Sequence, residues 1–286
     1  MGRKNIFNLI TGNAINVKIE YNRFKELIEE EIFYKKNHDS FTLFEYLDIN
    51  FFRSWPYRHR AIDLDDYLTS IDIRDDNGDL KVFSLENLLL YIEIFLNLIY
   101  FSKLTDVIEK DYESTIDSDL FNTIFNNIND LLNSLNYKYT VINKSRVIIV
   151  EKDPIATNVA ENNPEIADEI IEYRKYSLKG NINEKVRILK LLSNNLEGKL
   201  KSLKETSYSQ LASDIGYLIN NYDIRHNNKE GTYKKAYMKD ITEEELEEIY
   251  DMTYELILSV YTTNNYLNYN KIIDELKKKY PDNNKK

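Results

Sequence analysis

Apolar side chains recur every three or four positions along most of the chain, the spacing that places them on one face of an α-helix. In the first half this pattern predicts helices over residues 21–36, 40–55, 62–73, 84–104 and 117–136. The second of these is expected to begin near Ser40 and to end before Pro56, because a residue that precedes proline disfavours helical geometry. Asp117 or Ser118 is the expected N-cap of the last one.

Two stretches of the first half depart from the helical spacing. Residues 137–153 are rich in Val, Ile and Tyr and are split by Asn-Lys-Ser at 143–145, which predicts a β-hairpin. Residues 75–79 read Asp-Asp-Asn-Gly-Asp, and Asn-Gly readily adopts the left-handed conformations of a tight reversal. A second small hairpin is therefore expected around this turn.

From residue 165 onward the pattern is almost entirely helical. Helices are expected over residues 165–178, 183–205, 208–222 and 241–261. The last begins with Thr242 followed by Glu245, the spacing of a capping box. The second carries one apolar stripe for a partner helix: Leu189, Leu192, Leu196, Leu200 and Leu203.

The predicted fold class is therefore mainly α, with a small β-hairpin in the N-terminal part and a helical bundle in the C-terminal part. Pro154 and Pro164 bracket a polar joint between the two. We predict an N-terminal α(+β) region of residues 1–153, a C-terminal bundle of residues 154–280 and a disordered tail of residues 281–286.

Composition narrows the classes of fold and chemistry. Seven Gly and four Pro in 286 residues argue against sandwiches, barrels and Gly-rich nucleotide loops, which need many tight turns. The absence of Cys excludes disulfides, zinc–thiolate sites and Cys nucleophiles. The most apolar window, residues 85–101, contains Glu93 and Asn97 and falls short of the roughly 20 residues that span a bilayer, so we expect a buried core helix. With no apolar run of signal-peptide length, the protein is expected in the cytoplasm.

Arg225 and His226 are the leading candidates for chemistry. A formal net charge of −10 disfavours long contact with a nucleic-acid backbone but leaves room for a local basic site. Arg225 is suited to bind a phosphate and His226 to transfer a proton near neutral pH, while neighbouring amides orient the substrate: Asn221, Asn227 and Asn228. The alternative is a polar turn at a helix end, where cations are favoured by the helix dipole.

Residues 165–261 resemble the HEPN superfamily and related bacterial abortive-infection proteins. The similarity lies in two long helices with a Leu stripe, then Leu-Ile-Asn-Asn-Tyr-Asp-Ile-Arg-His-Asn-Asn at 218–228, then a final capped helix. The resemblance implies a homodimer and a metal-independent ribonuclease with Arg225 and His226 in its site. The usual motif places His several residues after Arg, whereas His226 is adjacent to Arg225, which implies either an inactive domain or a different use of His226.

A second basic and aromatic cluster lies at residues 53–60. Arg53, Arg58 and His59 accompany two aromatic residues, Trp55 and Tyr57, and this combination suits a phosphate or an unstacked base. The alternative is that Trp55 anchors a core while the arginines pair with nearby carboxylates at Asp63, Asp65 and Asp66.

Two functions follow as hypotheses. The first is a metal-independent endoribonuclease that acts as a toxin or effector in phage defence or abortive infection, with RNA as substrate and with an antitoxin or a phage trigger protein as a further partner. The second is a noncatalytic dimeric module for binding or regulation built on the same bundle. Neither hypothesis calls for a cofactor, a metal ion or a membrane.

Overall fold

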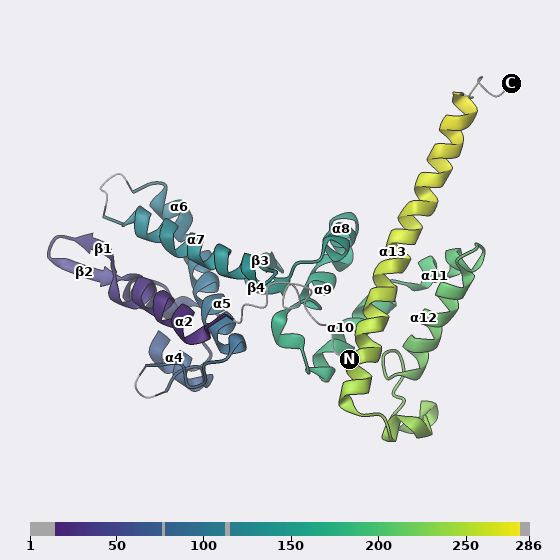
Figure 1. The fold of residues 1–286 in the computed structure, drawn as a ribbon, viewed down its shortest axis with the longest axis horizontal. Coiled ribbons are helices and arrows are strands. Elements are labelled where there is room, and N and C mark those ends of the chain that lie inside the picture. The colour runs from purple at the N-terminus through teal and green to yellow at the C-terminus, as the bar shows by residue number, and fades with distance from the viewer. Residues whose placement is uncertain (1–14, 76–77, 112–114, 281–286) are drawn as a thin grey trace. The chain divides into compact units, whose positions relative to one another are not determined.

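The computed structural model describes residues 15–75, 78–111 and 115–280, and the chain divides into two compact units between Lys152 and Asp153 (Figure 1). The sequence placed this boundary after residue 153. Helices dominate both units, and the strands of the described residues form two antiparallel two-stranded sheets. The mainly-α prediction is confirmed.

The first predicted helix is shorter than expected and gives way to a strand. α2 (Val17–Lys25) continues as a π-helical turn over Glu26–Glu30, and β1 (Ile32–Lys36) then pairs with β2 (Asp39–Thr42). Helix was therefore the wrong prediction for the end of residues 21–36. Tertiary contacts decide the outcome, because Phe33 is buried and its carbonyl accepts a hydrogen bond from the Asp117 amide at 2.8 Å.

The other predicted N-terminal helices lie within the predicted ranges as α3 (Leu43–Asn50), α4 (Leu64–Ser70), α5 (Leu85–Ser102) and α7 (Ser118–Ser134). The short helix α6 (Leu104–Ile108) was not predicted. Thr42, in a capping box with Glu45, starts α3 in place of Ser40, and Asp117 caps α7. Arg74 and Leu80 form a bridge around the predicted turn, whose residues 76 and 77 lie outside the described residues.

The two polar residues inside the apolar α5 bind a strand edge. The predicted hairpin is present as β3 (Tyr137–Ile142) and β4 (Arg146–Glu151). Glu93 accepts a hydrogen bond from the Ile149 amide at 2.9 Å, while the Asn97 amide donates to the Val147 carbonyl at 2.7 Å and accepts from its amide at 2.9 Å. These side chains therefore bind backbone groups of β4 on the edge where, among the described residues, no third strand pairs with it.

α5 is the single described helix long and apolar enough to cross a membrane by length and composition, and 67 % of it is buried within the structure. Burial of that kind is typical of a core helix in a globular unit. No membrane protein is indicated.

The C-terminal unit is a helical bundle. Its helices are α8 (Pro154–Asn162), α9 (Ala167–Glu172), α10 (Ile182–Asn194), α11 (Glu197–Lys204), α12 (Ser209–Asn221) and α13 (Glu243–Lys279), joined in part by short 3₁₀ turns at Pro164–Ile166, Tyr176–Leu178, Gly231–Tyr233 and Ala236–Lys239. The predicted joint after Pro154 is itself helical, with Asp153 as its N-cap. The predicted helix over residues 183–205 breaks at Asn195 and Leu196 into α10 and α11.

The helices of the bundle share one hydrophobic core. The predicted leucine stripe lies in this core, with Leu200 at its edge. The same core contains Ile215 and Ile219 of α12 and Tyr250, Tyr254 and Ile257 of α13. The buried Lys185 of α10 binds Glu247 at 2.7 Å and Asp251 at 2.6 Å on α13. α10, α12 and the first half of α13 therefore form a rigid support for the connection between α12 and α13.

Candidate functional site

Arg225 and His226 follow the end of α12 and do not lie on a helix. The helix ends at Asn221, and Asp223 then adopts a left-handed backbone conformation with φ of 63°. The Arg225 amide donates to the Ile219 carbonyl at 3.0 Å, which closes the turn over the helix end. On a helix, adjacent side chains would point about 100° apart, and this turn removes that constraint.

Asn228 holds the connection in place from inside. Its side chain is fully buried, accepts from the Asp223 amide at 2.8 Å, and donates to the carbonyls of Asn220 at 3.1 Å and Tyr233 at 2.9 Å. The backbone amide of Asn228 donates to the Asp223 carboxylate at 3.0 Å. The side-chain amide, which was predicted to contact substrate, therefore binds backbone groups of the protein itself.

The other two predicted amides also bind the backbone. Asn221 donates to the Tyr217 carbonyl at 2.7 Å within the last turn of α12. The exposed Asn227 accepts from the amides of Lys229 and Glu230 at 3.1 and 2.9 Å, as in an Asx turn. Asn227 nevertheless borders the same open space as Arg225 and His226.

That space is an open hollow of about 420 Å³, which we call the Arg225 hollow. It is lined by Lys190, Asp223, Ile224, Arg225, His226, Asn227, Lys229 and Glu230. Within the described part of the chain neither Arg225 nor Lys190 has an ion-pair partner, while Lys229 lies 3.5 Å from the Asp223 carboxylate. Two cations are therefore free to bind an anion there.

The His226 ring is held by stacking. It lies against Tyr233 with ring centroids 4.2 Å apart and planes 14° from parallel. No hydrogen bond to either ring nitrogen is formed by the described residues. One face of the imidazole is thus covered, and its nitrogens are available to a ligand.

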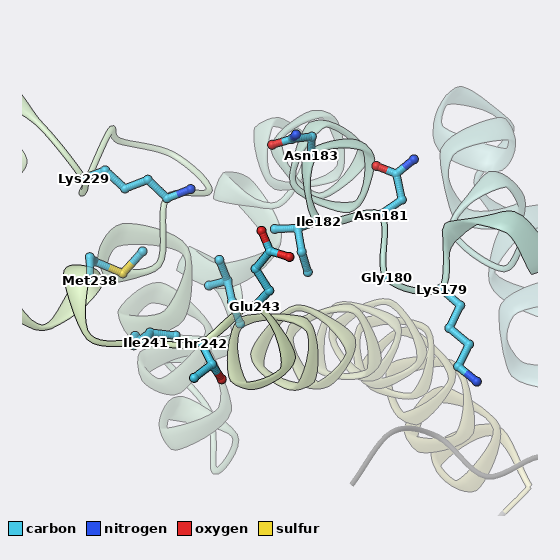
Figure 2. Close-up of a pocket in the computed structure, with 11 residues that line it drawn as sticks. Lys179, Gly180, Asn181, Ile182, Asn183, Lys229, Met238, Ile241, Thr242 and Glu243 are labelled. Carbon is cyan, nitrogen blue, oxygen red and sulfur yellow. The ribbon is translucent and has the colours of Figure 1, made fainter.

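A neighbouring hollow of about 440 Å³ shares Lys229 with the first. Figure 2 shows it between the starts of α10 and α13, with the Glu243 side chain pointing into it and Lys179 pointing away. The N-caps Asn181 and Thr242 already accept hydrogen bonds from the first turns of these helices. This space holds neither Arg225 nor His226, whereas the Arg225 hollow sets Lys190, Arg225 and Lys229 beside Asp223 and Glu230.

The second predicted cluster belongs to the other unit. Trp55 is buried against Phe52 and Tyr67, which confirms that it anchors a core. His59 stacks on Tyr67 at 6.3 Å, and Arg58 donates to the Ala61 carbonyl at 2.7 Å. The three predicted carboxylates have other roles, because Asp63 caps α4, Asp66 accepts from the Ile62 amide, and Asp65 pairs with Arg74. Arg53 is exposed, and none of this cluster lines the Arg225 hollow.

Neither Lys190 nor Tyr233 was singled out from the sequence. Lys190 lines the hollow from α10, and Tyr233, which stacks on His226, lies in a 3₁₀ turn seven positions after it. No local spacing distinguishes either from the other lysines and tyrosines of the chain, since each reaches the site through tertiary packing.

Among the described residues, no three His, Asp or Glu side chains come together in a group able to hold a metal ion. No protein-family model, curated protein or solved structure matches this chain.

Proposed function

We propose that the Arg225 hollow binds a phosphodiester of RNA and that the C-terminal unit cleaves RNA there without a metal ion. The observation that carries the proposal is that Arg225 and His226, adjacent in the chain, line one open hollow together with the unpaired Lys190. A phosphate-binding cation beside a group that transfers protons at neutral pH is the minimum equipment for this chemistry.

The reaction uses the 2′-hydroxyl of the RNA as its nucleophile. A neutral His226 ring takes the proton of that hydroxyl, the oxygen bonds to phosphorus, and the bond to the 5′-oxygen breaks. Arg225 and Lys190 counter the negative charge that grows on the phosphate oxygens. The leaving oxygen takes a proton from water in the open hollow, and the products are a 2′,3′-cyclic phosphate and a 5′-hydroxyl.

The family resemblance suggests the cellular role that such a ribonuclease would have. A cytoplasmic RNA-cleaving effector of phage defence or abortive infection would be held inactive by an antitoxin or released by a phage trigger protein. The separate N-terminal unit would then regulate the site or present substrate to it.

A second candidate is a module that binds an RNA phosphate and regulates without cleavage. It is favoured by the His226 ring, for which the described residues provide stacking on Tyr233 but no hydrogen bond that orients a ring nitrogen. Catalytic histidines are commonly oriented by a third group.

The test measures binding and cleavage separately. Labelled single-stranded RNA is incubated with the wild type, His226→Ala, Arg225→Ala and the control His38→Ala, which alters an exposed residue in the β1–β2 turn. Anisotropy reports binding, and a gel run after incubation with EDTA reports cleavage.

For a ribonuclease, His226→Ala abolishes cleavage but not binding, while Arg225→Ala weakens binding by about tenfold through loss of charge-assisted hydrogen bonds. If RNA is bound through Arg225 but the wild type leaves it intact, the regulatory module is correct. Binding that is unchanged in Arg225→Ala would contradict both candidates.

A further inference from the structure

The last part of α13 extends away from the bundle that its first part completes (Figure 1). Buried side chains along the helix end at Tyr261, and every residue from 271 to 280 is exposed. We call residues 262–280 the α13 extension. Its backbone is helical through Lys279, so helical order continues well past the last buried contact with the bundle.

The extension is amphipathic. Its apolar stripe is formed by Tyr266, Tyr269, Ile273, Leu276 and Tyr280, which alternate spacings of three and four residues and are 41–68 % exposed. This is the spacing of a two-helix seam. Apart from Leu267, which is partly buried against the bundle core, the opposite face is polar: Asn268, Lys271, Asp274, Glu275 and Lys278.

The stripe does not continue the face that packs into the bundle. In the first half of α13, Tyr250, Tyr254 and Ile257 mark the buried face. With one residue every 100°, the centre of the stripe is rotated by about 110° from that face. The apolar side chains of the extension are therefore arranged for a partner other than the helices of their own bundle.

We propose that the partner is the α13 extension of a second copy of this chain, in antiparallel orientation. The stripe is then self-complementary: Tyr269 of each copy lies opposite Tyr280 of the other, and Ile273 opposite Leu276. The aliphatic pairs form the centre, and the tyrosine pairs at either end keep their hydroxyl groups near water.

Charge favours this orientation. A parallel pair would bring two copies of Lys277, Lys278 and Lys279 together at one end, whereas the antiparallel pair separates them. The extension carries four lysines against Asp274 and Glu275, so its local charge does not separate a second copy from an anionic lipid surface, and the vesicle measurement below does so.

The available area is sufficient for a dimer. Within the paired segment, Tyr269, Ile272, Ile273, Leu276 and Tyr280 are exposed to about half of their surface, and since a buried aromatic side chain covers about 150–250 Å², each copy offers roughly 500 Å². The pair would bury about 1,000 Å² in total, the lower limit for a specific interface.

Such a dimer differs in kind from one that builds a shared cleft. The Arg225 hollow lies near the beginning of α13, and about 30 helical residues separate that end from the centre of the proposed pair. The two hollows would be roughly 90 Å apart and would act as independent sites on one particle. This inference holds whether or not the hollow cleaves RNA.

Light scattering of the full-length protein over a range of micromolar concentrations tests the interface. We expect a dimer for the wild type, and at least about tenfold weaker association for Ile273→Asp and Leu276→Asp, which place a charge at the centre of the apolar seam. Ile155→Asp is the matched control, because Ile155 is 53 % exposed in the same unit but lies outside the extension. The helical circular dichroism of all variants should stay unchanged, since the altered side chains are exposed.

Cross-linking tests the orientation, and the chain offers a background without Cys. Tyr269→Cys chains mixed with Tyr280→Cys chains should form a disulfide between the two kinds of chain on oxidation, and neither kind should cross-link alone. Cross-linking of Tyr269→Cys to itself would instead show a parallel pair and overturn the proposed orientation.

Three other results would overturn the proposal itself. They are a wild type that stays monomeric, a dimer that persists in Ile273→Asp, and a monomer that sediments with vesicles of phosphatidylcholine and phosphatidylserine. The last would assign the stripe to a lipid surface.

Discussion

At the scale of single residues, Asn228 shows how a polar side chain in a loop acquires a structural task. Its side-chain amide binds backbone groups at the end of α12 and in the connection between α12 and α13. These hydrogen bonds tie the segment that carries Arg225 and His226 to the end of α12. The alternative of a polar turn at a helix end is thus compatible with a site, since the turn is what positions the site.

Replacing Asn228 should disrupt that connection. Asn228→Ala removes the side-chain partner of three part-buried backbone groups, and we expect a loss of about 2–3 kcal/mol in the free energy of unfolding, measured by urea denaturation. Asn227→Ala is the control, because Asn227 is exposed, and it should cost less than about 1 kcal/mol. Equal effects of the two changes would contradict the role given to Asn228.

At the scale of elements, two contacts hold helices to their neighbours through polar side chains. One is the pair of Glu93 and Asn97 on α5 with the edge of β4. The other is Lys185 on α10 between Glu247 and Asp251 on α13. In each contact, hydrogen bonds between specific residues fix how the two elements are aligned along their lengths, which a purely apolar contact does less strictly.

The α5–β4 contact predicts a specific destabilisation. Asn97→Leu places an apolar side chain of similar size in the core and removes both hydrogen bonds to Val147. We therefore expect a loss of about 2–3 kcal/mol in the free energy of unfolding. Asn126→Leu on the exposed face of α7 is the control and should change stability little. A neutral effect of Asn97→Leu would show that water satisfies the β4 edge.

The α10–α13 contact predicts a dependence on pH. Burial alone would raise the pKa of the Glu247 carboxyl, but hydrogen bonds from Lys185 and from the Gly180 amide outweigh burial and lower this pKa below its ordinary value of 4.5. The folded state therefore gains stability from the ionised carboxylate above pH 4.5 and loses it as the pH falls through the lowered pKa. Urea midpoints of wild type and Glu247→Gln should differ at pH 7 and converge in acid.

The control for this measurement is Glu244→Gln, which alters an exposed carboxylate in the first turn of the same helix. Its midpoint should follow that of the wild type at every pH. A constant gap between wild type and Glu247→Gln across the whole range would contradict the assignment to ionisation.

At the scale of the whole molecule, the two units have separate hydrophobic cores. The only Trp of the chain, Trp55, lies in the core of the N-terminal unit, so its fluorescence reports the unfolding of that unit alone. The helical circular dichroism signal reports both.

Separate cores predict separate transitions. Leu189→Ala removes a fully buried side chain from the C-terminal core and should destabilise that unit by about 2–5 kcal/mol. We expect the circular dichroism transition in urea to shift while the Trp55 fluorescence transition stays in place. Ile92→Ala in α5 should shift the Trp55 fluorescence transition. A shift of the fluorescence transition by Leu189→Ala would show that the units unfold as one.

Local signals in the sequence determined most helices, their caps and one hairpin. Thr242 with Glu245, Asp117, and the alternation of Val and Ile in β3 and β4 act between residues close in the chain, so their outcome did not depend on the rest of the fold. The spacing of apolar residues likewise sufficed for the mainly-α class.

Tertiary structure alone decided the strand β1, the use of Glu93 and Asn97, and the composition of the Arg225 hollow. Each depends on groups far apart in the sequence: Phe33 with Asp117, Asn97 with Val147, and Arg225 with Lys190. Periodicity shows that a helix has an apolar face but not which partner covers it, which is why the length of α13 beyond Tyr261 also escaped prediction. Such contacts are decided by which apolar side chains become buried and by which groups give the buried backbone its hydrogen bonds, and both depend on the whole chain.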